Sequence, residues 1–265
     1  MKQKVLSSLI CCILGMTAIS SDVQAGNLDV YRNLLANNTY TIKYENITPP
    51  PRITNRDKAP LYGSSGLAVN KADYLTNRQR AGIIVGNGAD KYEEIGDGVI
   101  AMCRLIKNNE SYIFTKRQSN GAFEFFGDKK GTVKAIKRNI MAEIFGGQSY
   151  GDPDMTKLLN AILPASAKSA DAPQYQFAGS GSLGNGLNYE DYKVNANGMM
   201  EAVRYYFNGS TLVKISSATC YRKPNGELDG YKCIIKINEF SPNPDMKLLK
   251  LPEGLEDTTK RNGEE

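Results

Sequence analysis

Asparagine-glycine pairs divide this chain into short runs in which apolar and polar residues alternate. Two such pairs, at residues 197–198 and 208–209, separate alternating runs, and a third turn signal lies at residues 224–226. An Asn-Gly pair in this setting is the strongest short-range hairpin signal, because a type I′ turn needs positive φ angles at both central residues. Residues 189–240 are therefore predicted to form four antiparallel strands joined by three tight turns.

These turns predict which residues lie opposite each other. Tyr192 should face Val203 across the first turn, and Tyr205 should face Leu212 across the second. One face of the sheet then collects apolar side chains, which is the pattern of an antiparallel sheet with one buried face. The predicted inward residues are Tyr192, Val194, Val203, Tyr205, Phe207, Leu212, Ala218, Cys220, Cys233, Ile235 and Ile237.

A four-residue loop over residues 225–228 would place Cys220 directly opposite Cys233. Opposed residues of antiparallel strands lie about 4.5–5.5 Å apart at Cα, which is within disulfide range. A bridge closing so short a loop would add on the order of 3 kcal/mol. Two buried thiols are the alternative. Export to an oxidising compartment, which the start of the chain predicts, favours the disulfide.

The first 25 residues have the pattern of a secretory signal. Lys2 and Lys4 precede an apolar stretch from Val5 to Ile19, and the small residues Val23 and Ala25 mark a cleavage site. This apolar stretch is shorter than the roughly 20 residues of a transmembrane helix. We expect cleavage after Ala25 and an exported protein, periplasmic or secreted, with no transmembrane segment.

The rest of the chain is expected to form a single domain over residues 26–254, followed by a charged, disordered tail over residues 255–265. A helix capped by Asn27 is predicted over 27–36, and a strand over 38–48. A second meander and a closing strand should follow, with strands at Leu67–Tyr74, Ala81–Val85, Lys91–Ile95, Val99–Leu105, Ser111–Arg117, Ala122–Phe126, Gln174–Ala178, Leu187–Val194 and Met246–Leu251.

Two central helices are predicted where the apolar period changes. Residues 135–145 have helical spacing and end at two glycines, and residues 152–163 carry Pro153 near a helix start. The whole is an α+β chain: a strongly curved antiparallel sheet of about eleven or twelve strands, with the N-terminal helix and two central helices covering its concave face.

Composition excludes several kinds of chemistry. The chain has no His, so Ser-His-Asp catalysis and His metal sites are excluded, and we expect no enzyme activity, metal or cofactor. The net charge of +5 is dispersed and predicts no nucleic-acid surface. Neighbouring carboxylates at 93–94 and 190–191 point to opposite strand faces and should be exposed. Glycines 179, 181 and 184 match the dinucleotide fingerprint only as a string, because no helix follows them.

The order of predicted elements resembles the periplasmic lipoprotein-carrier superfamily, the LolA/LolB-like half-barrels. The similarity rests on the helix NLDVYRNLLANNT leading into YTIKY, the central helix pair, the FAGSGSL-to-YEDYKV strands, and VRYYFNGSTLVKI followed by LKLPEGL. The resemblance implies a half-barrel that holds lipid or acyl chains under a helical lid. The cysteine pair and the polar segment 49–65 are not part of that pattern.

Two functions follow from this fold. The first is a non-enzymatic exported protein that binds a lipid, a lipoprotein acyl group or another hydrophobic ligand inside the half-barrel. The alternative is an envelope interaction or sensor module whose concave face is filled by its own helices, with a protein partner and no small ligand. The residues predicted to line the cavity are Tyr192, Val203, Tyr205, Phe207, Leu212, Ile235 and Ile237.

Overall fold

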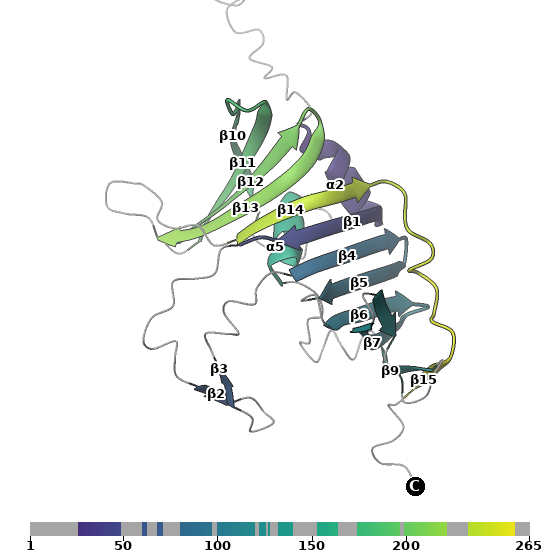
Figure 1. Cartoon of the computed structure of the whole chain (residues 1–265). Helices are drawn as coiled ribbons and strands as arrows, with labels where there is room; N and C mark the ends of the chain where they lie inside the picture. Colours follow the sequence, from purple (N-terminus) through teal and green to yellow (C-terminus); the bar gives the residue numbers. More distant parts are fainter. Residues whose placement is uncertain are drawn as a thin grey trace, which may run out of the picture.

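The computed structural model of this chain is mainly one large sheet with two helices (Figure 1). It describes residues 26–48, 60–62, 68–70, 80–96, 100–119, 122–125, 127, 132–139, 153–163, 174–196, 199–221 and 233–257. The predicted signal segment, the loop over 225–228 and residues 258–265 of the predicted tail lie outside the described residues.

The strands are short and join mostly as consecutive hairpins. Their bounds are β1 Thr39–Asn46, β2 Pro60–Tyr62, β3 Ala68–Asn70, β4 Arg80–Asn87, β5 Asp90–Gly96, β6 Ile100–Lys107, β7 Glu110–Ser119, β8 Ala122–Phe125, β9 Val133–Asn139, β10 Gln176–Ser182, β11 Leu187–Ala196, β12 Met199–Asn208, β13 Thr211–Tyr221, β14 Cys233–Ser241 and β15 Leu255–Asp257. β2 and β3 pair only with each other, as a small separate sheet.

Strand β1 joins two meanders into one sheet. It pairs antiparallel with β14 on one edge and with β4 on the other. The sheet has thirteen strands in the order β10-β11-β12-β13-β14-β1-β4-β5-β6-β7-β9-β15, with β8 pairing with β7 off this path. Its pairing is antiparallel except between β9 and β15. The sheet is open, and the prediction of an α+β chain built on an antiparallel sheet is confirmed.

Two of the three predicted helices form in the described residues. Helix α2 spans Leu28–Ala36, and helix α5 spans Pro153–Ile162. Asn27 makes no side-chain cap, contrary to the expectation; its backbone N–H donates instead to Glu190 at 2.7 Å. Within the described residues, neither helix has the length and apolar character needed to cross a membrane.

The helix predicted over residues 135–145 is wrong where the structure describes it, because residues 133–139 form strand β9. Ala135 and Ile136 pair with Phe114 and Ile113 of β7, and Val133 and Ala135 are buried while Ile136 is half exposed. So short an apolar run fits the two-residue repeat of a strand as well as the 3.6-residue repeat of a helix. Here the pairing with β7 makes it a strand.

The hairpin turns lie close to their predicted positions, but some of the strands pair in a register that differs from the predicted one. Asn108 and Asn109 form the β6–β7 turn with φ angles of 53° and 62°, as a type I′ turn requires. Tyr192 pairs with Val203, as predicted. The β12–β13 turn is made by residues 209–210 and not 208–209, so Phe207 pairs with Leu212.

A bulge in β13 changes which side chains lie on the buried face. Tyr206 pairs with Lys214 and Phe207 with Leu212, so Val213 is an extra residue between the two pairs. Beyond the bulge, Tyr205 pairs with Ile215 and not with Leu212. The predicted period of two is broken at this point, because an extra residue moves every later side chain to the other face.

The C-terminal end also differs from the prediction. Residues 246–250 form turns where a last strand was expected, and residues 255–257 of the predicted disordered tail form β15. The segment between β14 and β15, yellow in Figure 1, runs past the ends of β1, β4 and β5. Thr41 Oγ1 donates to the carbonyl of Asn243 at 2.8 Å, and Lys107 Nζ donates to the carbonyl of Leu249, also at 2.8 Å.

The buried face of the sheet changes at β4. Ile84 belongs to a core formed by α2, α5, β1, β4 and β11–β14, which we call the helix-covered core. Its neighbour Val85 points to the opposite face and belongs to a second core, formed by β4–β7, β9 and Leu249, which we call the C-terminal core. The sheet is thus covered by helices on one face and by the C-terminal segment on the other.

Replacing Gly82 by Ala should destabilise the junction of these two cores. Gly82 pairs with Tyr44, and a Cβ at residue 82 would lie 2.2 Å from the ring of that buried tyrosine. Displacing a packed ring costs about 1–3 kcal/mol, so G82A should lower the urea midpoint. Gly184→Ala is the control, because its Cβ would meet open space. Equal midpoints for the two variants would contradict the close packing of Tyr44 on β4.

Candidate functional site

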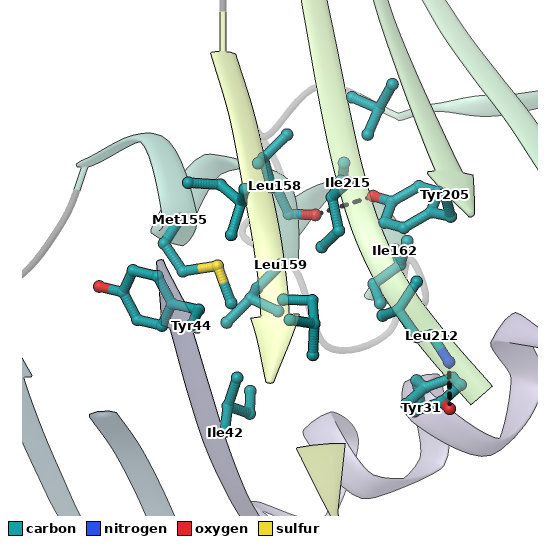
Figure 2. Packing of buried hydrophobic residues seen from close by; sticks show 14 of the residues in the cluster. Tyr31, Ile42, Tyr44, Met155, Leu158, Leu159, Ile162, Tyr205, Leu212 and Ile215 are labelled. Carbon is teal, nitrogen blue, oxygen red and sulfur yellow. Dashed lines mark hydrogen bonds between the residues drawn. The ribbon is translucent and has the colours of Figure 1, made fainter. Parts of the chain in front are cut away.

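All seven residues predicted to line a cavity lie in the helix-covered core. Each is buried, with no more than 6% of its surface exposed. They come from four consecutive strands, β11 to β14, and belong to one core with residues of α2 and α5. Figure 2 shows two of them, Tyr205 and Leu212, beside these helices. The residues are Tyr192, Val203, Tyr205, Phe207, Leu212, Ile235 and Ile237. The sequence pattern therefore identified the buried face of this meander, although it misplaced some cross-strand pairs.

The sequence prediction missed Ile215, which is fully buried in the same core. The bulge at Val213 places Leu212 and Ile215 on one face although they are three residues apart. An apolar spacing of three inside an otherwise alternating strand is the signal that a bulge leaves in a sequence. Ala218 is also buried, but it lies on the opposite face of β13.

Helix α5 contributes an apolar face to this core. Met155, Leu158, Leu159 and Ile162 are all buried. The hydroxyl of Tyr205 donates to the carbonyl of Leu158 at 2.8 Å (Figure 2). This bond attaches the helix to the centre of β12 and satisfies the fully buried hydroxyl of Tyr205.

Helix α2 is attached through Tyr31. The Tyr31 hydroxyl accepts a hydrogen bond from the backbone N–H of Leu212 at 2.8 Å and donates to the carbonyl of Ser210 at 3.1 Å (Figure 2). Its ring lies 4.7 Å from the ring of Phe240. Tyr31 thus satisfies backbone groups next to the bulge and holds the start of β13 against the helix.

A cluster of polar side chains links both helices to β11 at the margin of the core. The guanidinium of Arg32 lies 5.0 Å from the ring centre of Tyr192, and it donates to Asp29 at 2.6 Å and to the carbonyl of Ile162 at 3.1 Å. The Tyr192 hydroxyl donates to Glu190 at 3.1 Å. Glu190 is only 6% exposed, so the expectation that this carboxylate is exposed is wrong.

The tyrosines of the site stay neutral near physiological pH. Burial raises the pKa of Tyr192 to about 12, and burial also raises the pKa of Tyr205 well above its usual value. Both hydroxyls therefore act as hydrogen-bond groups. The arrangement offers an apolar wall with a few uncharged polar atoms, which suits the binding of an apolar chain that carries a polar end.

A second cluster of polar side chains lies in the C-terminal core, on the opposite face of the sheet. Lys116 lies 2.6 Å from Glu94 and 3.0 Å from the Tyr92 hydroxyl, which also bonds to Glu94. Burial raises the pKa of Tyr92 and raises that of Cys103 to about 12. These raised pKa values keep the Tyr92 phenol and the Cys103 thiol protonated at neutral pH, so neither group is activated as a nucleophile.

Glu93 is a further carboxylate that the sequence pattern placed at the surface. It is buried, and it pairs with Lys91 at 2.7 Å and Arg104 at 3.3 Å on the other face of β5 from Glu94. Within the described residues, no group of three or more His, Cys, Asp or Glu side chains could hold a metal ion.

The predicted placement of Cys220 opposite Cys233 is wrong. Cys233 pairs with Ser217, and Cys220 pairs with Met200 on the other edge of β13. Cys220 is three residues beyond Ser217, or about 10 Å along the strand, which exceeds the Cα separation of about 7 Å that a disulfide can span. No disulfide is found in the described part of the chain. The observed pairing of Ser217 with Cys233 differs from the predicted register by three residues, and the connection over residues 222–232 lies outside the described residues.

The glycines at 179, 181 and 184 do not form a dinucleotide-binding turn. Gly179 and Gly181 lie within β10, and Gly184 lies in the turn before β11. A pyrophosphate site needs the N-terminus of a helix after the glycines, and here a strand follows. The prediction that a strand and not a helix follows these glycines is confirmed.

Removing the Tyr31 hydroxyl should weaken the attachment of α2. In Tyr31→Phe the buried N–H of Leu212 loses its acceptor, which should cost about 1–3 kcal/mol of unfolding free energy in urea titrations. Tyr206→Phe is the matched control, because its hydroxyl meets only the side chain of Ser216, at 3.3 Å and half-buried. If both variants lose equal stability, Tyr31 does not have this role.

Comparison with known proteins gives no family assignment. No protein-family model matches the chain, and no curated protein matches it. The similarity to the lipoprotein carriers therefore stays a prediction from the sequence pattern. What supports a function is the geometry of the helix-covered core.

Proposed function

We propose that this chain is an exported, non-enzymatic protein that binds a lipid, a lipoprotein acyl group or a similar hydrophobic ligand. In this proposal the sheet curves around α2 and α5 as a half-barrel. The ligand binds the wall formed by strands β11–β14 in place of helix α5. The observation that carries the proposal is that two short, separate helices cover the larger of the two apolar cores in the described residues.

The helices are suited to act as a movable cover. They have nine and ten residues, fewer than the roughly 12–15 that an isolated helix needs, so their stability comes from packing on the sheet. Helix α5 contacts the wall through four large apolar side chains and the carbonyl of Leu158, and its Lys157 pairs with Glu201 of β12 at 2.6 Å. An acyl chain would make the same kind of contact with the wall, so it can replace α5 at a small net change in buried apolar area.

The polar atoms at the wall would then orient the ligand. Displacing α5 releases the Tyr205 hydroxyl from the carbonyl of Leu158 and the Arg32 guanidinium from the carbonyl of Ile162. A neutral donor in the centre and a cation at the margin suit a lipid with an ester or acidic head group. The apolar wall would hold the chains, and Arg32 would lie near the head group.

The alternative is an interaction module with a permanently filled core. A specific observation favours it: the seven wall residues are already buried by the protein's own helices. In that case α5 stays in place and a partner protein binds elsewhere. The two functions differ in whether the mature protein carries or takes up a hydrophobic molecule.

The first test is mass spectrometry of organic extracts from mature protein purified without detergent, followed by titration with a fluorescent fatty acid. A lipid present in stoichiometric amount supports the carrier, and saturable uptake of the probe does the same. Clean extracts together with no uptake would reject the carrier and leave the interaction module.

A pair of cavity-creating variants should separate ligand binding from stability. Ile235→Ala and Leu105→Ala each truncate a fully buried side chain, the first in the helix-covered core and the second in the C-terminal core. Both should lose about 2–5 kcal/mol of stability. Only Ile235→Ala should change the affinity for the fatty-acid probe, by tenfold or more. Equal affinities in the two variants would contradict binding at this wall.

Export predicts a defined N-terminus. Helix α2 begins at Leu28, so cleavage after Ala25 would leave every described element of the fold intact. The full-length chain, expressed with a secretion pathway, should be recovered outside the cytoplasm with a mass that starts at Gly26. Recovery in the cytoplasm with residues 1–25 attached would contradict export.

A further inference from the structure

The buried carboxylate of Glu190 lies at the start of helix α2. Glu190 comes from β11, pairs across the strands with Tyr205, and is only 6% exposed. One oxygen accepts the backbone N–H of Asn27 at 2.7 Å, and the other accepts the hydroxyl of Tyr192 at 3.1 Å. Both donors are neutral.

This carboxylate has no cationic partner within the described residues. Arg32 lies over the ring of Tyr192, but its guanidinium is bonded to Asp29 and to the carbonyl of Ile162. A buried charge is costly unless it is paired as well as hydrogen-bonded. The carboxylate would therefore be strongly stabilised by a cation placed at the same point.

Gly26 lies against this carboxylate. A Cβ on Gly26 would be 2.9 Å from one oxygen of Glu190 and 3.0 Å from the other, so any side chain here would have to displace Glu190. By bond lengths alone, the nitrogen of Gly26 is then within about 6 Å of the nearer oxygen. Glycine lets the backbone approach the carboxylate and lets its nitrogen turn toward it.

We propose that Glu190 is a buried acceptor site for the α-amino group that cleavage after Ala25 creates on Gly26. The proposal rests on the export and processing given above under the proposed function. Hydrolysis of the Ala25–Gly26 peptide bond by a signal peptidase consumes one water and leaves a carboxylate on Ala25 and an ammonium group on Gly26. A neutral amide with one N–H becomes a cation with three donors, next to the one buried acid that faces it.

Formation of this pair would couple processing to the cover of the apolar wall. Glu190 already holds the first turn of α2 through Asn27, and the same helix carries Tyr31 and Arg32. An ion pair at its start would fix α2 on the sheet only in the processed chain. The unprocessed precursor, with an uncharged nitrogen at residue 26, would hold α2 more weakly.

The primary test measures the pKa of the Gly26 amine. The chain is released from a fusion in vitro so that it starts at Gly26, and it is labelled with an acylating reagent at a series of pH values. An α-amino group ordinarily has a pKa of about 7.7–8.0. Pairing with Glu190 should raise the pKa by about one unit, which lowers labelling at pH 7 about tenfold relative to an unpaired amine.

Two variants make this test specific. Glu190→Gln keeps an acceptor for Asn27 but removes the charge, so the amine should return to its ordinary pKa. Glu45→Gln removes an equal charge from an exposed position on β1 and should keep the raised value. An ordinary pKa in the unmodified chain, or an unchanged shift in Glu190→Gln, would overturn the proposal.

A second measurement does not depend on a Glu190 variant. A chain that keeps the neutral residues Val23, Gln24 and Ala25 moves the amine about 10 Å along the backbone. At pH 7 the chain that starts at Gly26 should melt several degrees higher than this extended chain. Equal melting temperatures at pH 7 would overturn the proposal.

The pH dependence has a definite sign. The amine has a higher pKa in the folded state, so its stabilisation is fully present below about pH 8 and is lost as the pH rises through the folded value, near pH 9. The other groups that face it are Arg32, Asp29, Tyr192 and Tyr205. Arg32 stays charged over this range because its pKa is raised above the usual value, and burial raises the pKa of both tyrosines above this range. The melting difference should therefore close between about pH 8 and pH 10.

Failure of this inference and failure of export give different results. The labelling and melting experiments use a terminus made in vitro and do not depend on secretion. An ordinary pKa together with a natural terminus at Gly26 would reject the ion pair and keep the export proposal. A raised pKa together with cytoplasmic, unprocessed protein would keep the acceptor site and reject export as its natural cause.

Discussion

The pairing of β1 on both of its edges is the interaction on which the rest of this structure depends. Without β1, the meander β10–β14 and the meander β4–β9 would be separate sheets, each with an unpaired edge. Tyr40, Ile42 and Tyr44 project from β1 into the helix-covered core, and Thr41 on the other face bonds to the C-terminal segment. Strand β1 thus forms backbone hydrogen bonds with both meanders. Its side chains contact the helices on one face of the sheet and the C-terminal segment on the other.

Local signals in the sequence predicted the hairpins well. Positive φ angles at Asn108 and Asn109, and the pairing of Tyr192 with Val203, follow from turn chemistry that acts over a few residues. The predictions were wrong where pairing with a segment distant in the sequence determines the structure. Residues 133–139 form a strand because β7 offers a free edge, and the register of β13 depends on a bulge and on a long connection to β14. The edge of β7 lies outside the segment that pairs with it, whereas the bulge leaves an apolar spacing of three residues within β13.

In the candidate site, too, features set by local sequence could be predicted and features set by distant contacts could not. The seven wall residues could be predicted because an alternating pattern reports which face of a strand is apolar. Glu190 could not, because its burial comes from a helix more than 160 positions earlier in the chain. A strand carboxylate is usually solvated, so its burial becomes visible only once α2 is placed against β11. A half-barrel curvature and a movable α5 are parts of the proposed function.

The position of β1 also affects when the fold can form. Its partner segment lies about 200 residues further along the chain: the contact between Thr41 and Asn243 spans 202 positions. Contacts this distant in sequence must overcome a large loop-closure entropy, and proteins rich in them fold slowly. Synthesis would have to proceed past residue 241 before β1 and β14 could join the two meanders. In the proposed export, this late step would leave the sheet incomplete until the chain has crossed the membrane.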